Sequence, residues 1–298
     1  MKRKIYYILM LAMISAFFAS CSKESLSDES IIVVDEAEQT PFDAWLKQNY
    51  VKPYNIEVQY RMKDVESDMN YYIVPAQYEY SVAMAHLVKY LCLEAYDEVA
   101  GVTFTRTYFP KLIAMFGSWQ FRNNGTFVLG TAEGGKKISL YGLNEIGQYL
   151  HDPGTLNSYY FKTIHHEFTH ILNQTKNYPT EFQEVSGADY VADSWSTAPY
   201  NTTYLTRGFV SDYAQHSAGE DFAETLSIFV THDAAYWANI LSGAGDKAAT
   251  IQSKFEIVYN YMKESFGIDL YKLRQTIQRR QKDVVDSKID LTDVTVEK

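Results

Sequence analysis

The spacing of hydrophobic and polar positions predicts strands in the first half of the chain and mostly helices after them. Short apolar or alternating runs bounded by turn residues are typical of strands. The expected strands span residues 55–62, 111–116, 126–129 and 137–143, with turns at Asn123-Asn124-Gly125 and Gly134-Gly135. Apolar positions three and four residues apart are typical of amphipathic helices. These expected helices span residues 42–49, 78–99, 217–230, 249–263 and 270–281.

A further helix is expected between the last of these strands and residue 173. Its apolar positions recur at helical steps and form one stripe that would face the core. The stripe consists of Tyr160, Ile164, Phe168, Ile171 and Leu172. Asn157 or Ser158 is a suitable N-cap, and the segment Asn173–Pro179 is expected to end the helix. An order in which the strands of the sheet come first and most helices follow is typical of an α+β fold.

The motif His166-Glu167-Phe168-Thr169-His170 lies within this helix. Residues four apart share a helix face, so His166 and His170 project together, with the Glu167 carboxylate beside them. Two such histidines are part of a zinc site, and the glutamate between them is the general base of zinc metallopeptidases. The motif therefore predicts zinc-assisted hydrolysis of peptide bonds, in which Glu167 takes a proton from the attacking water and passes it to the leaving amine.

A catalytic zinc usually has three protein ligands, so a third ligand is expected elsewhere. The metzincin continuation requires glycine and histidine where this chain has Asn173 and Lys176, and that class is excluded. Asp189 and Asp193 follow the helix and could each supply an oxygen. Neither lies in a pattern that demands a metal.

A second acidic motif, Glu220-Asp221-Phe222-Ala223-Glu224, opens the expected helix at residues 217–230. Glu220 and Glu224 share a face, one turn apart. Two carboxylates beside an apolar stripe are costly to desolvate unless a cation or hydrogen bonds compensate them. We therefore expect Glu220 to be the third zinc ligand and Glu224 to orient a ligand histidine through its other ring nitrogen. The alternative is a solvated first turn, where acidic residues interact favourably with the helix dipole.

An H-E-x-x-H motif followed much later by E-x-x-x-E resembles the gluzincins, and the double histidine at 165 and 166 is also found in the Bacteroidetes proteins named next. The segment Gly208–Ala214 before Glu220 resembles, more specifically, the zinc metallopeptidase lipoproteins of Bacteroidetes, described as substrate-import-associated zinc metallohydrolases. The similarity extends upstream through residues 53–58 and 125–135, so it covers most of the chain after residue 40. With the element order, it predicts a zincin-like α+β domain at residues 41–298, in which zinc lies in the cleft between an N-terminal sheet lobe and a helical C-terminal lobe.

Two further roles follow from this resemblance. The E-x-F-A-E segment is also similar to that of the anthrax lethal factor type of protease, which has a tyrosine seven residues before its ligand glutamate. Tyr213 stands at that spacing, so the resemblance implies that it hydrogen bonds the developing oxyanion. In gluzincins an edge strand commonly holds extended substrate, and the strand at residues 137–143 is our candidate.

The N-terminus predicts a bacterial lipoprotein. Lys2-Arg3-Lys4 precedes an apolar run from Ile5 to Ala19 and then Ser20-Cys21, which is typical of a signal peptide spanning residues 1–20. The small residues before Cys21 resemble a lipobox, so we expect cleavage there, acylation of Cys21, and a tether at residues 21–40. This predicts an outer-membrane lipoprotein of the cell envelope. The acid-containing segment just after Cys21 resembles the surface-export signal of Bacteroidetes, which implies exposure at the surface, and the family resemblance implies an outer-membrane nutrient importer as a partner.

The net charge of −10 argues against nucleic acid and anionic lipid headgroups as partners. The expected substrate is a peptide or protein, as the H-E-x-x-H motif indicates. Once Cys21 is acylated, Cys92 is the only thiol, and its apolar neighbours indicate a buried structural residue. The histidines outside the motif are expected on the surface or in structural roles. The competing hypothesis is a nutrient-binding module with a structural or vestigial zinc, in which Trp119, Trp195 and Trp237 could stack on glycans. Retention of Glu167 favours the enzyme, because a structural zinc needs no such carboxylate.

Overall fold

The computed structural model describes residues 39–63, 70–121, 127–133 and 136–296. The expected signal peptide, Cys21 and nearly all of the tether lie outside the described residues, as do the turns at 123–125 and 134–135. Residues Thr40–Lys298 form one compact unit. No helix among the described residues has the length and apolar character needed to cross a membrane.

The first part of this unit combines helices with short strands. Its helical elements are α2 (Pro41–Leu46), η2 (Lys47–Val51), α3 (Lys52–Tyr54), α4 (Tyr78–Val88), η4 (Lys89–Leu93), α5 (Glu94–Ala100) and α6 (Val102–Tyr108). Its strands are β1 (Glu57–Gln59), β2 (Leu112–Met115), β3 (Gln120–Phe121), β4 (Phe127–Val128), β5 (Gly130–Glu133) and β6 (Lys137–Leu140). The predicted strands are present but shorter than expected, and α6, β3 and β5 were not predicted.

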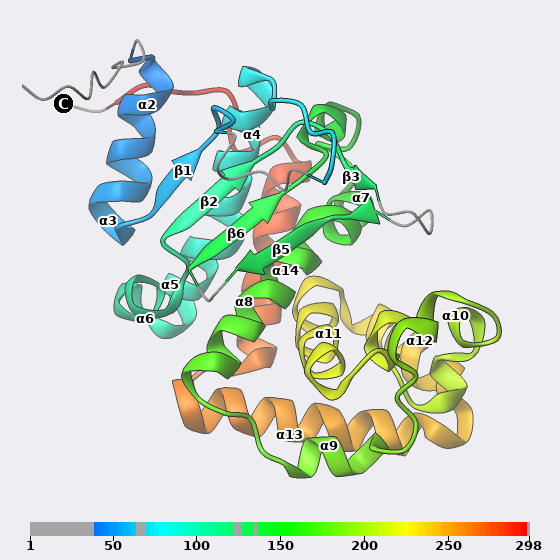
Figure 1. Cartoon of the computed structure of the whole chain (residues 1–298). Helices are drawn as coiled ribbons and strands as arrows, with labels where there is room; N and C mark the ends of the chain where they lie inside the picture. Colours follow the sequence, from blue (N-terminus) through cyan, green and yellow to red (C-terminus); the bar gives the residue numbers. More distant parts are fainter. Residues whose placement is uncertain (1–38, 64–69, 122–126, 134–135, 297–298) are drawn as a thin grey trace, which may run out of the picture. The chain divides into compact units, whose positions relative to one another are not determined.

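The second part is helical. The first of its elements are η5 (Leu143–Gln148), α7 (Pro153–Leu156), η6 (Asn157–Phe161), α8 (Lys162–Thr175), α9 (Glu181–Ser186), η7 (Ala192–Ser196), α10 (Tyr200–Thr203) and η8 (Leu205–Arg207). They are followed by η9 (Tyr213–Gln215), α11 (Ala218–Thr231), α12 (Ala234–Ala244), η10 (Gly245–Lys247), α13 (Ala248–Phe266) and α14 (Leu270–Val285). The three helices predicted after residue 217 are confirmed to within a few residues. In Figure 1, α8 lies between the sheet and a group of helices that includes α9, α11 and α13.

The main sheet has the strand order β1-β2-β6-β5. Strands β1, β2 and β6 are parallel, and β5 runs antiparallel to β6. The expectation that residues 137–143 form an edge strand is therefore wrong, because β6 pairs with β2 on one side and β5 on the other. Strand β5 is the edge that lies next to α8.

Close approach of β5 to α8 depends on Gly130. A Cβ atom at this position would lie 2.7 Å from Cγ2 of Thr163 on α8 and 2.9 Å from the carbonyl oxygen of Ser139 on β6. Both distances are shorter than a Cβ atom can approach a neighbouring heavy atom, so a larger residue would push the strand and the helix apart. The absence of a side chain here brings the sheet edge beside the motif helix.

The predicted N-cap of the motif helix, Asn157 or Ser158, is wrong. The helical segment begins about one turn earlier, where the Asp152 carboxylate accepts hydrogen bonds from the backbone nitrogens of Gly154 and Thr155. Asp152 is an equally good cap and precedes a proline at the first helical position. Asn157 instead is buried, and its amide donates to the carbonyl oxygen of Thr231.

Two buried phenylalanines fix the rotation of the helices that carry the two motifs. Phe168 of α8 is fully buried, with its ring centroid 5.1 Å from that of Tyr96 and 4.9 Å from that of Phe109. Phe222 of α11 is fully buried between Phe182 and Tyr261, at 4.9 and 5.3 Å. Each phenylalanine lies inside its motif, so burying the ring turns the polar motif residues to a neighbouring face.

Candidate metal centre

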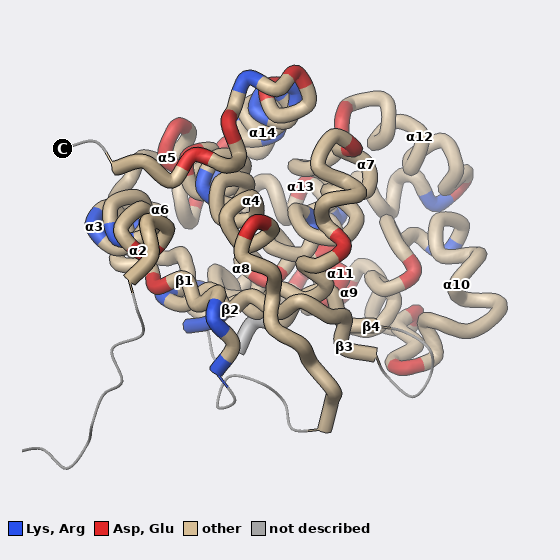
Figure 2. Tube along the Cα trace, turned by 90° about the horizontal axis from the view of Figure 1, so that it is seen from above, with Lys and Arg blue, Asp and Glu red and all other residues tan. Residues whose placement is uncertain are grey.

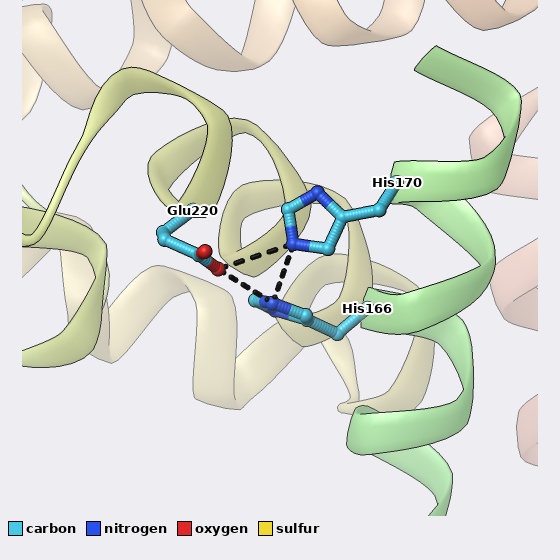
Figure 3. Close-up of side chains that lie close together, drawn as sticks. All are labelled: His166, His170 and Glu220. Atoms are coloured by element: carbon cyan, nitrogen blue, oxygen red, sulfur yellow. Dashed lines mark hydrogen bonds and ion pairs between the residues drawn. The ribbon is translucent and has the colours of Figure 1, made fainter. Parts of the chain in front are cut away.

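Three side chains from α8 and α11 converge on one point (Figure 3). Nε2 of His166 lies 2.9 Å from Oε2 of Glu220, and Nε2 of His170 lies 3.1 Å from the same oxygen. The two imidazole Nε2 atoms are 3.0 Å apart. His166 is buried, whereas His170 and Glu220 are partly exposed, with about a fifth of each side chain accessible. Residues separated by some fifty positions in sequence thus present three donor atoms to one another.

Local structure explains why these three donors meet. His166 and His170 are one turn apart on α8, which packs directly against α11. Helix α11 starts at its N-cap Ser217, whose side chain accepts a hydrogen bond from the backbone nitrogen of Glu220. Glu220 therefore lies in the first turn, facing the two histidines.

The donor set suits zinc. Zinc binds imidazole nitrogen and carboxylate oxygen at about 2.0–2.2 Å, so tetrahedral ligand atoms lie about 3.3–3.5 Å apart. The three observed separations of 2.9, 3.0 and 3.1 Å would need to open by only a few tenths of an ångström. Three protein ligands leave a fourth position for water, as in catalytic zinc sites.

Glu224 lies behind the histidine pair. Its Oε1 is 2.9 Å from Nδ1 of His166, and its carboxylate also accepts hydrogen bonds from Lys162 Nζ at 3.0 and 3.1 Å and from Ser211 Oγ at 2.6 Å. Only 1% of the Glu224 side chain is exposed. With Nδ1 facing Glu224, Nε2 of His166 is directed at Glu220, which is the arrangement expected for a metal-binding histidine.

The electrostatic balance of these groups favours charged carboxylates. Burial alone would raise the pKa of Glu220, but His166 and His170 hold it well below its usual value. Burial would likewise raise the pKa of Glu224, but Lys162 and His166 lower it. For His166, burial lowers the pKa while Glu220 and Glu224 raise it, and the net value is about 9. A cation is thus strongly stabilised between these carboxylates.

A cavity of about 250 Å³ opens beside His166. Glu167 and Tyr213 both line it, and the Tyr213 ring centroid is 5.9 Å from that of His166 and 5.0 Å from that of Trp195. The rest of the wall comes from both sides of α8 and comprises Phe127, Val128, Leu129, Gly130, Lys162, Thr163, Trp195, Asp212 and Glu224. The cavity thus joins the start of the edge strand to the motif residues.

Sequence reasoning assigned Lys162, Ser211 and Asp212 no place at this site, and it considered Trp195 only as part of a possible glycan-stacking surface. Lys162 could have been found, because it precedes His166 by four residues and so shares its helix face. The other three lie in irregular or 3₁₀ segments, and their approach to Glu224 and Tyr213 depends on the path of the chain between α8 and α11. No local periodicity indicates it.

The alternative oxygen donors do not join the histidines. Among the described residues, the cluster that could hold a metal contains His166, His170 and Glu220, and neither Asp189 nor Asp193. Asp193 is fully exposed, with Oδ1 3.4 Å from Nε2 of His216. The main-chain oxygen of Asp189 accepts a hydrogen bond from Arg207.

His165, Cys92 and Trp237 are buried side chains that pack in the core. His165 lies on the other side of α8, in the core, where burial lowers its pKa to about 3. Its Nδ1 lies 3.0 Å from the hydroxyl of Tyr96, and its Nε2 lies 3.8 Å from Sγ of Cys92. Cys92 is fully buried, as expected. Trp237 is buried against Phe229 and Phe255, which leaves no face for a glycan.

A buried ion pair secures the segment that leads to Tyr213. Lys254 of α13 donates to Oδ2 of Asp221 at 2.6 Å and to the carbonyl oxygen of Gly208 at 2.9 Å. Its Nζ also lies 3.9 Å from the Phe209 ring centroid. Asp221 follows Glu220 directly, so this pair ties the first turn of α11 to the loop that runs to Ser211 and Tyr213. Burial raises the pKa of Asp221 to about 6, although Lys254 opposes the rise.

Comparisons with known proteins agree with this geometry. The model of the family described as "Putative zinc-binding metallo-peptidase" matches residues 35–271. The crystal structure of a "putative zinc-binding metallo-peptidase" from Bacteroides caccae is similar, with 41% sequence identity, coverage of 89% of this chain and 100% of that chain, and a TM-score of 0.73. No curated protein matches the chain. The resemblance inferred from the motifs is thus confirmed, and the chain belongs to this family of zinc-binding metallo-peptidases.

Proposed function

We propose that this protein is a zinc-dependent peptidase whose metal is held by His166, His170 and Glu220. The observation that carries the proposal is the convergence of these donors within 3.1 Å, next to a cavity lined by Glu167 and Tyr213. A purely structural zinc needs neither an accessible cavity nor a carboxylate between its histidines. We therefore prefer the peptidase to the alternative of a non-catalytic binding module.

The chain's own residues divide the chemistry between them. When bound, zinc lowers the pKa of a water molecule toward about 7 and polarises the scissile carbonyl. Glu167 accepts the proton of the attacking water and delivers it to the leaving amine nitrogen. Tyr213, beside the His166 ring, donates a hydrogen bond to the oxyanion that develops on the former carbonyl oxygen. Glu224 keeps His166 oriented through Nδ1.

Extended substrate would lie along β5. An edge strand offers backbone donors and acceptors to a peptide, and β5 ends the sheet next to α8. Residues Phe127–Gly130, which lead into β5, also line the cavity. A peptide paired with this edge would therefore present its backbone to Glu167 and Tyr213, in a cleft between the sheet and the C-terminal helices.

We further propose that the enzyme is an outer-membrane lipoprotein anchored by acyl groups on Cys21. The basic, apolar and small-residue segments that precede Cys21 support this assignment. The anchor would hold the peptidase at the cell envelope, exposed at the surface beside a nutrient importer.

Radiolabelled palmitate should label the parent and not a Cys21→Ser variant, and added protease should remove the protein from intact cells. Full protection would argue against surface exposure.

The first prediction concerns Glu167. The chain from Ser22 onward should bind one zinc and cleave members of a diverse peptide library, whereas Glu167→Ala should retain zinc and lose at least ~10²-fold in turnover, because the proton acceptor is gone. Zinc content by mass spectrometry and cleavage by peptide sequencing are the measurements. Zinc binding without cleavage in the parent would refute the peptidase and favour a binding module.

The second prediction separates Glu220 from Glu224. Glu220→Ala removes a ligand and should abolish stoichiometric zinc binding, whereas Glu224→Ala removes only the partner of His166 Nδ1 and should weaken zinc affinity by roughly 10- to 100-fold. Competition titration against a chelator measures both affinities. Asp246→Ala, on the short η10 segment, is a matched acidic control that should not change them. The reverse ranking would exchange the two roles.

The third prediction concerns Tyr213. Tyr213→Phe should keep the ring against His166 and Trp195 but lose the hydroxyl, so kcat should fall ~10²-fold with unchanged zinc content. Steady-state kinetics on the best library peptide would test this. A variant that lost zinc, or one with parental kcat, would remove Tyr213 from the mechanism.

A further inference from the structure

A partly exposed aromatic surface borders the cavity on the side of the β3–β4 pair. We call it the aromatic shelf and define it as Trp119, Phe121, Phe127, Tyr149 and Tyr159. Phe121 is 62% exposed and Phe127 is 38% exposed, although both are large apolar side chains. Two such rings in direct contact on a surface are unusual without a function, because isolated exposed apolar residues are the normal case.

The rings of the shelf form a continuous series. Phe121 and Phe127 are paired across the two strands, with ring centroids 6.0 Å apart. Phe127 in turn lies 5.0 Å from Trp119 and 6.2 Å from Tyr159. Tyr149 extends the series at 5.7 Å from Tyr159.

The base of the shelf is held rigidly. Trp119 lies so close to Gly142 that a Cβ atom there would be 2.3 Å from its ring, and Gly142 has a φ of +74° that favours glycine. Tyr160 stacks on Trp119, with their ring centroids 6.1 Å apart. The Tyr160 hydroxyl also donates a hydrogen bond to the Gly142 carbonyl oxygen at 2.9 Å. A rigid aromatic surface loses little conformational entropy when a ligand covers it.

Phe127 belongs to both the shelf and the cavity. From Phe127 the chain continues through Val128 and Leu129 into the edge strand β5. The described residues of this region, 118–121 and 127–131, contain no charged side chain. Figure 2 accordingly shows the labelled β3 and β4 without blue or red. A ligand that entered the cavity along the edge strand would thus meet the aromatic rings of these described residues.

We propose that the aromatic shelf is a specificity subsite that binds apolar side chains of an extended peptide substrate, to one side of the scissile bond. This proposal rests on the proposed peptidase function. Phe121 and Phe127 face each other across β3 and β4, so the two rings, with centroids 6.0 Å apart, together offer one apolar contact surface. The shelf therefore selects an apolar side chain at one position of the substrate, beside the scissile bond.

The experiment uses the full chain, loaded with zinc, and paired peptides that differ only in carrying leucine or serine at the position where cleavage of the peptide library shows the strongest preference for apolar residues. The parent should cleave the leucine peptide with the higher kcat/KM. Phe121→Ser should reduce this leucine-to-serine ratio by roughly 5- to 10-fold, because one apolar contact is lost. It should leave zinc content unchanged, since Phe121 does not line the cavity beside the metal donors. Tyr236→Ser, at an aromatic residue on α12 that is 44% exposed, is the control and should behave as the parent.

Binding of the same peptides to Glu167→Ala, with and without Phe121→Ser, separates failure of the shelf from failure of the peptidase. If the parent cleaves neither peptide but Phe121→Ser still weakens binding of the leucine peptide, the shelf proposal is supported and the peptidase proposal is refuted. If cleavage occurs and the ratio is unchanged in Phe121→Ser, the shelf is refuted. Loss of binding to phosphatidylethanolamine–phosphatidylglycerol vesicles in Phe121→Ser, with an unchanged peptide ratio, would also overturn the proposal and assign the surface to lipid.

Discussion

Packing of α8 against α11 is the constraint on which the candidate metal centre depends. Neither helix carries a complete donor set, since His166 and His170 come from one and Glu220 from the other. A rotation of either helix by one residue, about 100°, would turn its donors away from the common point. Phe168 and Phe222 oppose such rotation, because each would have to leave a fully buried position. Apolar burial inside the two motifs thus sets the polar geometry beside them.

The same constraint extends to the groups around the donors. Glu224 lies one turn after Glu220 and therefore reaches Nδ1 of the histidine whose Nε2 faces Glu220. A carboxylate this deeply buried needs several partners, and Lys162 and Ser211 supply them. Lys254 and Asp221 hold the preceding loop against α11 in the same way. The cavity wall that contains Tyr213 is thus connected to the donor helices through buried polar contacts.

Local sequence predicted the parts of this arrangement that depend on helix periodicity. The one-turn spacing of His166 and His170, and of Glu220 and Glu224, is enough to place each pair on one face. The burial of Phe168 and the start of the second helix near residue 217 follow from patterns of the same length. The edge strand was predicted wrongly because strand order depends on pairing between distant segments. The four residues of β5 include Gly130, which is small and favours no strand on its own. The N-cap was predicted wrongly because the helical segment starts at an equally suitable residue, Asp152, one turn earlier.

X-ray absorption at the zinc edge, combined with anomalous diffraction from crystals of the zinc-loaded protein, tests the central claim most directly. The account predicts a single strong anomalous peak between His166, His170 and Glu220, with two nitrogen ligands and oxygen ligands at about 2.0–2.2 Å. It also predicts no comparable peak near His216 and Asp193, the other described His–Asp contact near Tyr213. A peak located elsewhere, or one bonded to both histidines but not to Glu220, would contradict the assignment of the metal centre.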